Sequence, residues 1–154
     1  MLWRSIIVYI HERGDIMEYK SNIPCHCFRL RRAGNKLTEI YNTYLAQCGL
    51  TPGQFSLLSQ IRQNEPVNTS RLAEIMSLDR TTLVRNLKSL EREEYITFSH
   101  GKGRERPISL TVTGKEKQAQ AEILWEQAQK KFENTLGSDK MEQFREILDT
   151  ISKM

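Results

Sequence analysis

The residues in this chain with the clearest chemical use are hydrogen-bond donors gathered between positions 80 and 92. They are short polar or long cationic side chains, namely Arg80, Thr81, Thr82, Arg85, Asn86, Lys88, Ser89 and Arg92. An arginine can donate two hydrogen bonds to guanine, an asparagine can pair with adenine, and a threonine can contact a phosphate or a thymine methyl group. We predict a helix whose outer face carries Thr81, Thr82, Arg85, Lys88, Ser89 and Arg92. The candidate DNA-binding residues on this helix are Arg80, Thr81, Thr82, Arg85, Asn86 and Lys88.

A second group of cations lies near the tip of a predicted hairpin, where two glycines permit a tight reversal. These cations are Lys102, Arg104 and Arg106. Arginine suits a narrow minor groove, where negative potential is concentrated, and we expect Lys102 to hold a phosphate. At the start of an earlier predicted helix, Thr69 and Ser70 offer hydroxyls and free N–H groups to another phosphate.

A basic helix face by itself is more often solvated than bound to nucleic acid. Here a basic hairpin follows the helix at once, and this combination favours a winged helix that binds DNA. The alternative is a winged-helix module that binds another protein, because one fold hosts several functions. A neutral or acidic second helix would indicate that alternative, whereas this helix is basic.

The sequence carries no signature of an enzyme. It contains no nucleophile elbow, phosphate loop or pair of carboxylates at catalytic spacing, and its three histidines are scattered. Cys25-His26-Cys27 does not predict a metal site, because adjacent residues cannot easily converge on one ion and no second Cys/His group has zinc spacing. We therefore expect no catalytic residue, no metal and no cofactor.

Apolar periodicity predicts which elements position these residues. We expect helices over about 27–48, 52–64, 69–76, 80–93, 115–136 and 139–151, and strands over 95–98 and 108–112. Thr51-Pro52-Gly53-Gln54 is a helix start with a capping box, and Asp79 is the expected N-cap of the basic helix. The predicted fold class is mainly α with a small β-hairpin wing, a winged helix-turn-helix with N- and C-terminal dimerisation helices.

The composition suits one domain with short extensions. Hydrophobic residues make up 38% of the chain, and the formal net charge of +4 suits a nucleic-acid partner. A chain of 154 residues buries only a modest core, so leftover apolar helix faces are expected to pair between subunits. The apolar run 2–10 is too short to cross a bilayer, and the odd number of cysteines favours reduced thiols. We expect a cytoplasmic protein with no membrane partner.

Several segments resemble the MarR family of regulators. They are Ser70–Glu74, Leu78–Leu87, Leu90-Glu91 and Ser109–Gly114, and their order around the predicted wing matches the family from about residue 27 to residue 151. The family's wing usually carries Asp-x-Arg. Lys102-Gly103-Arg104 keeps the arginine but lacks the aspartate that helps to orient the wing.

The resemblance implies a triangular homodimer, joined by the first helix and the two C-terminal helices, that reads a pseudo-palindromic double-stranded DNA site. It also implies a repressor that leaves DNA when a small molecule or an oxidant alters the dimer. On this basis we expect an N-terminal extension (1–24), a helical dimerisation region (25–48 and 113–154) and a DNA-binding lobe (49–112).

Cys27 is the candidate redox sensor within this resemblance. Cys27-Phe28 lies near the start of the first helix and Tyr41 follows fourteen residues after Cys27, as in the branch that senses organic hydroperoxides. In those relatives a tyrosine at the position of Tyr41 hydrogen-bonds the thiolate, whereas two other supporting tyrosines are replaced here by Arg31 and Pro52. The alternatives are a purely structural Cys27, or release by a small aromatic or lipophilic ligand between the dimer arms and the lobe.

Overall fold

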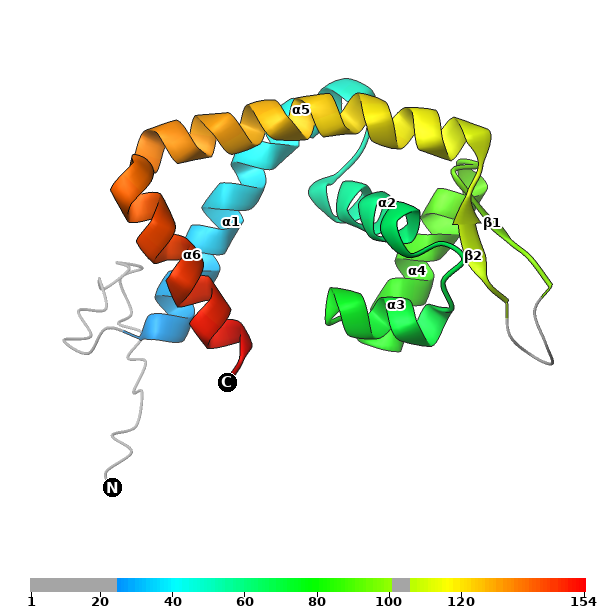
Figure 1. Ribbon diagram of the computed structural model, residues 1–154, viewed down its shortest axis with the longest axis horizontal. Helices are drawn as coiled ribbons and strands as arrows, with labels where there is room; N and C mark the ends of the chain where they lie inside the picture. Colours follow the sequence, from blue (N-terminus) through cyan, green and yellow to red (C-terminus); the bar gives the residue numbers. More distant parts are fainter. Residues whose placement is uncertain (1–24, 101–105) are drawn as a thin grey trace, which may run out of the picture.

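The computed structural model describes residues 25–100 and 106–154. Its elements are α1 (His26–Leu45), a short 3₁₀ helix η1 (Ala46–Cys48), α2 (Pro52–Asn64), α3 (Thr69–Met76), α4 (Arg80–Arg92), β1 (Ile96–Phe98), β2 (Ile108–Leu110), α5 (Val112–Leu136) and α6 (Ser138–Ser152). Figure 1 shows α5 as a long arch, with α1 and α6 below its left part and α2, α3, α4 and the hairpin below its right part. The predicted class, mainly helical with one hairpin wing, is confirmed.

Side-chain caps set the helix starts that the sequence predicts. Thr51 and Gln54 form the reciprocal capping box of α2. Asn68 caps α3 by accepting a backbone N–H three residues along the chain at 2.8 Å, and Asp79 caps α4 in the same way at 2.9 Å. Each cap satisfies a backbone donor that the first turn of a helix leaves without a partner.

The junction between β2 and α5 differs from the prediction. The strand was expected to continue to Val112 and the helix to begin after Gly114, but β2 ends at Leu110 and α5 begins at Val112. Thr111 ends the strand because its hydroxyl accepts the N–H of Gly114 at 2.9 Å and donates to the carbonyl of Glu94 at 2.7 Å. The N-cap geometry of Thr111 thus overrides its preference for strands.

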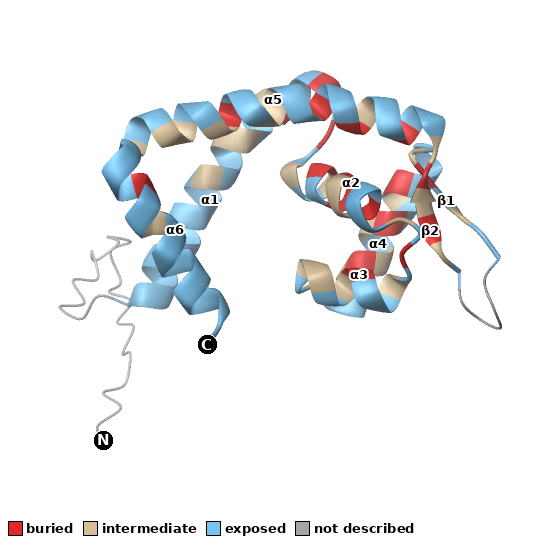
Figure 2. Cartoon of the chain, in the orientation of Figure 1, coloured by how far each residue is buried: buried red, intermediate tan, exposed pale blue. Residues whose placement is uncertain are grey.

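The part of the molecule below the right end of α5, which we call the lobe, contains a continuous hydrophobic core. Its largest fully buried side chains are Leu57, Leu58, Ile61, Leu72, Leu83, Leu90 and Ile108, joined by Leu45 from the end of α1. Phe55 of α2 stacks on Trp125 of α5 with ring centroids 5.9 Å apart, so the core continues onto the arch. Figure 2 shows buried residues concentrated in the lobe, whereas α1 and α6 are largely exposed.

Helices α1 and α6 are joined to the second half of α5. The hydroxyl of Tyr41 in α1 donates to the side-chain oxygen of Gln129. Phe144 of α6 meets Phe132 edge to face, with ring centroids 5.5 Å apart. Residues 25–100 and 106–154 leave the remaining surfaces of α1 and α6 uncovered.

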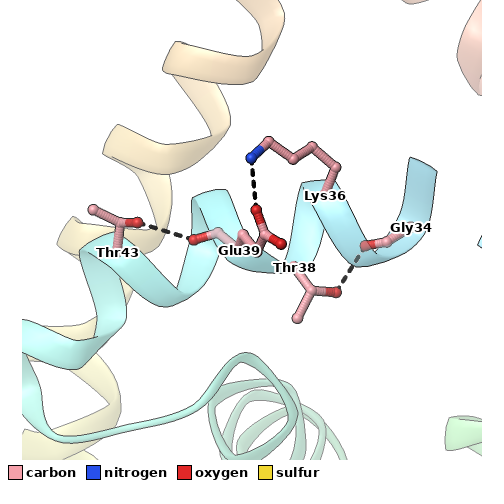
Figure 3. Close-up of polar contacts among 5 residues, drawn as sticks. All are labelled: Gly34, Lys36, Thr38, Glu39 and Thr43. Atoms are coloured by element: carbon pink, nitrogen blue, oxygen red, sulfur yellow. Dashed lines mark hydrogen bonds and ion pairs between the residues drawn. The ribbon is translucent and has the colours of Figure 1, made fainter. Parts of the chain in front are cut away.

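Several exposed polar side chains of α1 interact with residues one turn away on the same helix. Lys36 pairs with Glu39 at 2.6 Å, and the hydroxyls of Thr38 and Thr43 each donate to a backbone carbonyl one turn back at 2.9 Å (Figure 3). Such short-range pairs support an exposed helix but contribute little to overall stability. Within residues 25–100 and 106–154, no helix is long and apolar enough to cross a membrane.

Candidate nucleic-acid interface

A tight turn sets the angle between α3 and α4. Ser77 adopts the left-handed conformation (φ 50°, ψ 39°), and its N–H donates to the carbonyls of Ala73 and Glu74. The N–H of Leu78 donates to the carbonyl of Ala73 at 3.1 Å, and Asp79 then begins α4. This is a helix-turn-helix, in which the second helix is the element that enters a DNA major groove.

The exposed face of α4 is cationic. Leu83, Leu87 and Leu90 are buried in the lobe core. Arg80 and side chains at helical spacing on the opposite side are exposed, namely Thr81, Arg85, Lys88 and Arg92. Within the described part of the chain, no carboxylate pairs with Arg80, Arg85 or Lys88, so their donors face solvent.

Three polar residues of α4 lie at the edge of the buried stripe. Thr82, Asn86 and Ser89 follow one another at helical spacing and are all half-buried. The prediction that Ser89 belongs to the outer face is wrong, because its hydroxyl lies 3.5 Å from the side-chain nitrogen of Gln54 in α2, which donates to it. Thr82 and Asn86 present only part of their surface to a ligand.

The described part of the wing brings Arg106 close to α4. Its guanidinium lies over the ring of Phe98, 5.1 Å from the centroid, and its side chain is exposed. A depression of about 210 Å³ separates the hairpin base from the two helices, and Thr69, Lys88 and Arg106 are among its lining residues. The fold thus gathers donors from α3, α4 and the hairpin, while Lys102 and Arg104 fall outside the described residues.

Asp79 holds the first turn of α4 in place. Hydrogen bonds from the Thr82 side chain, and then from the Thr82 backbone N–H, lower the pKa of Asp79 below its ordinary value. The ionised carboxylate complements the positive end of the helix dipole. The turn that carries Arg80 and Thr81 is thereby fixed before any ligand binds.

The candidate sensor residues lie on α1 and do not meet within one chain. Cys25 is the N-cap, and the exposed thiol of Cys27 lies 4.0 Å from a guanidinium nitrogen of Arg31. Tyr41 lies fourteen positions after Cys27 in the helix, roughly 21 Å along the axis. The pKa of Tyr41 is raised by burial and then by the charge of Glu133, so the hydroxyl remains protonated and donates to Gln129.

A pocket of about 440 Å³ lies where α2, the end of α3 and α5 meet. Its lining residues are aromatic, apolar or polar, namely Phe55, Ser56, Ser59, Gln60, Gln63, Ile75, Met76, Glu122 and Trp125. The stacked pair Phe55 and Trp125 forms one wall. Four of these lining residues are apolar and five are polar, so the pocket offers a small molecule one aromatic wall with polar groups around it.

Two residues near the interface carry no clear signal in the sequence. The sequence predicts only that Phe98 is a strand residue, yet its ring lies under the guanidinium of Arg106. Glu65 reads as part of a turn, yet its carboxylate accepts the N–H of Leu110 at 2.8 Å and lies 3.1 Å from the ammonium of Lys115. Local spacing cannot reveal either contact.

The chain is similar to known regulators in sequence. Residues 50–106 match the sequence model of the MarR family. The HTH-type transcriptional regulator SarZ of Staphylococcus epidermidis is 34% identical over 92 residues, which make up 58% of this chain and 62% of SarZ. The match therefore spans less than two thirds of that relative's length.

Solved structures extend the similarity to most of the chain. The M. tuberculosis transcriptional regulator MosR, in complex with DNA, is 30% identical with a TM-score of 0.72, and the match covers 84% of this chain and 97% of MosR. The transcriptional repressor CouR, bound to a 23-mer DNA duplex, is 25% identical with a TM-score of 0.78, and the match covers 82% of this chain and 92% of CouR.

Proposed function

The chain belongs to the MarR family of winged-helix transcription regulators, and from this premise we propose that it is a homodimeric repressor of a pseudo-palindromic operator. The observation that carries the proposal is the cationic outer face of α4 beside Arg106 at the base of the wing. MosR and CouR, which share this fold, are seen bound to DNA. The family consists of transcription regulators rather than enzymes.

In the proposed complex, α4 lies in the major groove with its first two turns against the bases. Arg80 and Arg85 donate to guanine, and the half-buried Asn86 reaches adenine from the edge of the helix. Thr81, Thr82 and Lys88 contact the backbone, as do Thr69 and Ser70 at the start of α3. Arg104 and Arg106 approach the adjacent minor groove, and Lys102 holds a phosphate.

The proposed dimer uses the surfaces of α1 and α6 that the described residues leave exposed. Large apolar side chains are exposed there: Phe28 (62%), Leu30 (46%), Ile147 (57%), Leu148 (37%) and Ile151 (44%). An exposed apolar surface of this extent on one end of a molecule indicates a protein contact. We assign residues 25–48 and 113–154 to dimerisation and 49–112 to the DNA-binding lobe, although the first turns of α5 also pack on the lobe core.

Two triggers for release from DNA are compatible with the fold. The pocket between α2, α3 and α5 contacts both the arch and the lobe, so a small aromatic or lipophilic ligand there would alter their relative position. The second trigger is oxidation of Cys27, which is exposed and has the cation of Arg31 beside it.

The DNA-binding function is tested by selecting genomic fragments with the purified protein, footprinting the selected site, and measuring its affinity across a salt series. Arg85→Ala should weaken operator binding by about 5- to 100-fold and relax discrimination at one base pair. Lys130→Ala, which removes an exposed cation from α5, is the control and should change affinity less than about twofold.

Two results would contradict the proposal. If Arg85→Ala binds the operator as the parent does, α4 is not the reading element. If the parent does not distinguish genomic from random DNA at any salt concentration, a protein-interaction role replaces sequence-specific binding.

A further inference from the structure

Glu65 lies at the C-terminal end of α2, and its carboxylate contacts two other elements. Oxygen Oε2 accepts the N–H of Leu110 in β2 at 2.8 Å, and Oε1 lies 3.1 Å from Nζ of Lys115 in α5. The side chain of Glu65 is 21% exposed, whereas that of Lys115 is 54% exposed. The carboxylate is therefore held between the hairpin and the first turn of α5, partly shielded from water.

The contact with Leu110 completes an edge of the hairpin. On the edge of β2 that faces away from β1, Ile108 exchanges two backbone hydrogen bonds with Val67, at 2.8 Å and 3.1 Å. Backbone groups two residues apart on a strand face the same edge, so the N–H of Leu110 lies next along this edge. The carboxylate of Glu65 supplies the acceptor there, and the segment between α2 and α3 is fastened to β2 at two successive positions.

We propose that Glu65 is a positioning residue that holds the wing in register with the helix-turn-helix, so that both can engage one DNA duplex. This inference rests on the proposed DNA-binding function. A carboxylate that accepts a backbone N–H forms a charge-assisted hydrogen bond, which is stronger than one between neutral groups. The ion pair with Lys115 is more exposed and contributes less.

The position of Arg106 makes the effect measurable. Arg106 lies four residues before Leu110 in the sequence, roughly 13 Å away along an extended chain. Glu65 therefore cannot act on Arg106 by direct contact, and any energetic coupling between them must pass through the strand. Arg85 lies on α4 and serves as the reference contact that does not depend on the wing.

A double-mutant cycle on operator affinity tests the proposal. Arg106→Ala should weaken binding about tenfold in the parent and about twofold or less in a Glu65→Ala background, because the misplaced wing no longer uses Arg106. Arg85→Ala should lower operator affinity by the same factor in the parent and in the Glu65→Ala background. Glu65→Gln keeps an acceptor for Leu110 and should retain the coupling, and Lys115→Met should stay within about twofold of the parent.

A second measurement reports the contact without DNA. Amide hydrogen exchange at Leu110 should accelerate about tenfold or more in Glu65→Ala and stay near the parent rate in Glu65→Gln. If Glu65→Ala does not fold, Glu65→Asp replaces it in the double-mutant cycle, because its side chain is shorter by one methylene group. If Glu65 only stabilised the fold, Glu65→Ala would reduce the contributions of Arg85 and Arg106 to operator affinity alike.

The possible failures can be told apart. If the parent binds its operator but the effects of the two substitutions are additive, only the proposed role of Glu65 is overturned. A parent that binds no duplex overturns the DNA-binding function, and the positioning role falls with it. Unchanged exchange at Leu110 in Glu65→Ala likewise overturns the inference, because the N–H would then not depend on the carboxylate.

Discussion

Asp79 determines where α4 begins and how its first turn is held. Its carboxylate accepts the N–H of Thr82 at 2.9 Å, and the Thr82 side chain and backbone lower its pKa. A group with a lowered pKa in the folded state stabilises the fold above its unfolded pKa of about 3.9, and this contribution is lost as pH falls through the folded pKa.

We therefore predict a pH-dependent effect for Asp79→Asn, which keeps an oxygen acceptor but not the charge. The variant should melt at a slightly lower temperature than the parent between pH 5 and 8, because it loses the charge that faces the positive end of the helix dipole. The difference should shrink below about pH 4, where the carboxylate of the parent becomes protonated. Thermal melts by circular dichroism measure it, and a constant difference down to pH 3 would exclude a role for the charge.

Cys27 provides the second prediction at this scale. In the proposed oxidation the sulfur of Cys27 attacks one peroxide oxygen and the O–O bond breaks. A sulfenic acid forms, and the leaving alkoxide takes up a proton to become an alcohol. Cys27→Ser should abolish release of DNA by cumene hydroperoxide, as followed by fluorescence anisotropy. Cys25→Ser, two residues away and still able to cap α1, is the matched control and should release DNA as the parent does. Release by the Cys27→Ser protein would exclude oxidation of Cys27 as the trigger.

The junction between β2 and α5 is packed closely against the segment that precedes β1. Gly114, in the first turn of α5, lies directly against the backbone of Tyr95 just before β1. The carbonyl of Tyr95 also accepts the N–H of Thr111 at 3.1 Å. This close approach joins the end of α4, the hairpin and the arch.

We predict that Gly114→Ala destabilises the protein by about 1–3 kcal/mol, because the added methyl group would overlap the carbonyl oxygen of Tyr95. Gly34→Ala is the matched control, since a methyl group there meets open space on α1. The control should be neutral or stabilising by up to about 1 kcal/mol, because alanine favours a helix. Urea unfolding at constant pH distinguishes the two, and equal stability of both variants would refute the packing argument.

Local patterns predict most of these elements well. The starts of α2, α3 and α4 are confirmed, because each cap is formed by residues within one helical turn. The start of α5 was misplaced, because Thr111 is held by the carbonyl of Glu94 from an earlier part of the chain. A strand-like sequence therefore became the N-cap of a helix.

In the molecule as a whole, buried residues are concentrated in the lobe, whereas α1 and α6 are largely exposed (Figure 2). The lobe has its own core, while α6 presents Ile147, Leu148 and Ile151 to solvent. A second copy of the chain on this surface would place two α4 helices on one side of the assembly, as a pseudo-palindromic site requires.

We predict that Ile147→Glu weakens dimerisation by about 30-fold or more, because a carboxylate would be buried without a partner in the apolar centre of the contact. Val112→Glu is the control, since Val112 is 76% exposed at the opposite end of α5. Sedimentation equilibrium measures both, and operator affinity should fall only for Ile147→Glu. A dimer unaffected by Ile147→Glu would place the contact elsewhere.

Residue patterns alone predicted the helices, the caps of α2 and α4 and most of the cationic face of α4. These features depend on residues within one or two turns of each other, where helical period and capping chemistry suffice. Arg85 and Lys88 are exposed as predicted, on the side opposite the leucines.

Tertiary structure alone decided which groups from distant segments meet. It turned Ser89 toward Gln54, placed Phe98 under Arg106, and brought the carboxylate of Glu65 to the N–H of Leu110, 45 residues away. Such contacts have no local period, because they follow from how whole elements pack around a shared core. For this reason the DNA-contacting side chains could be proposed from the residues, whereas the group proposed to hold the wing beside them could be found only in the fold.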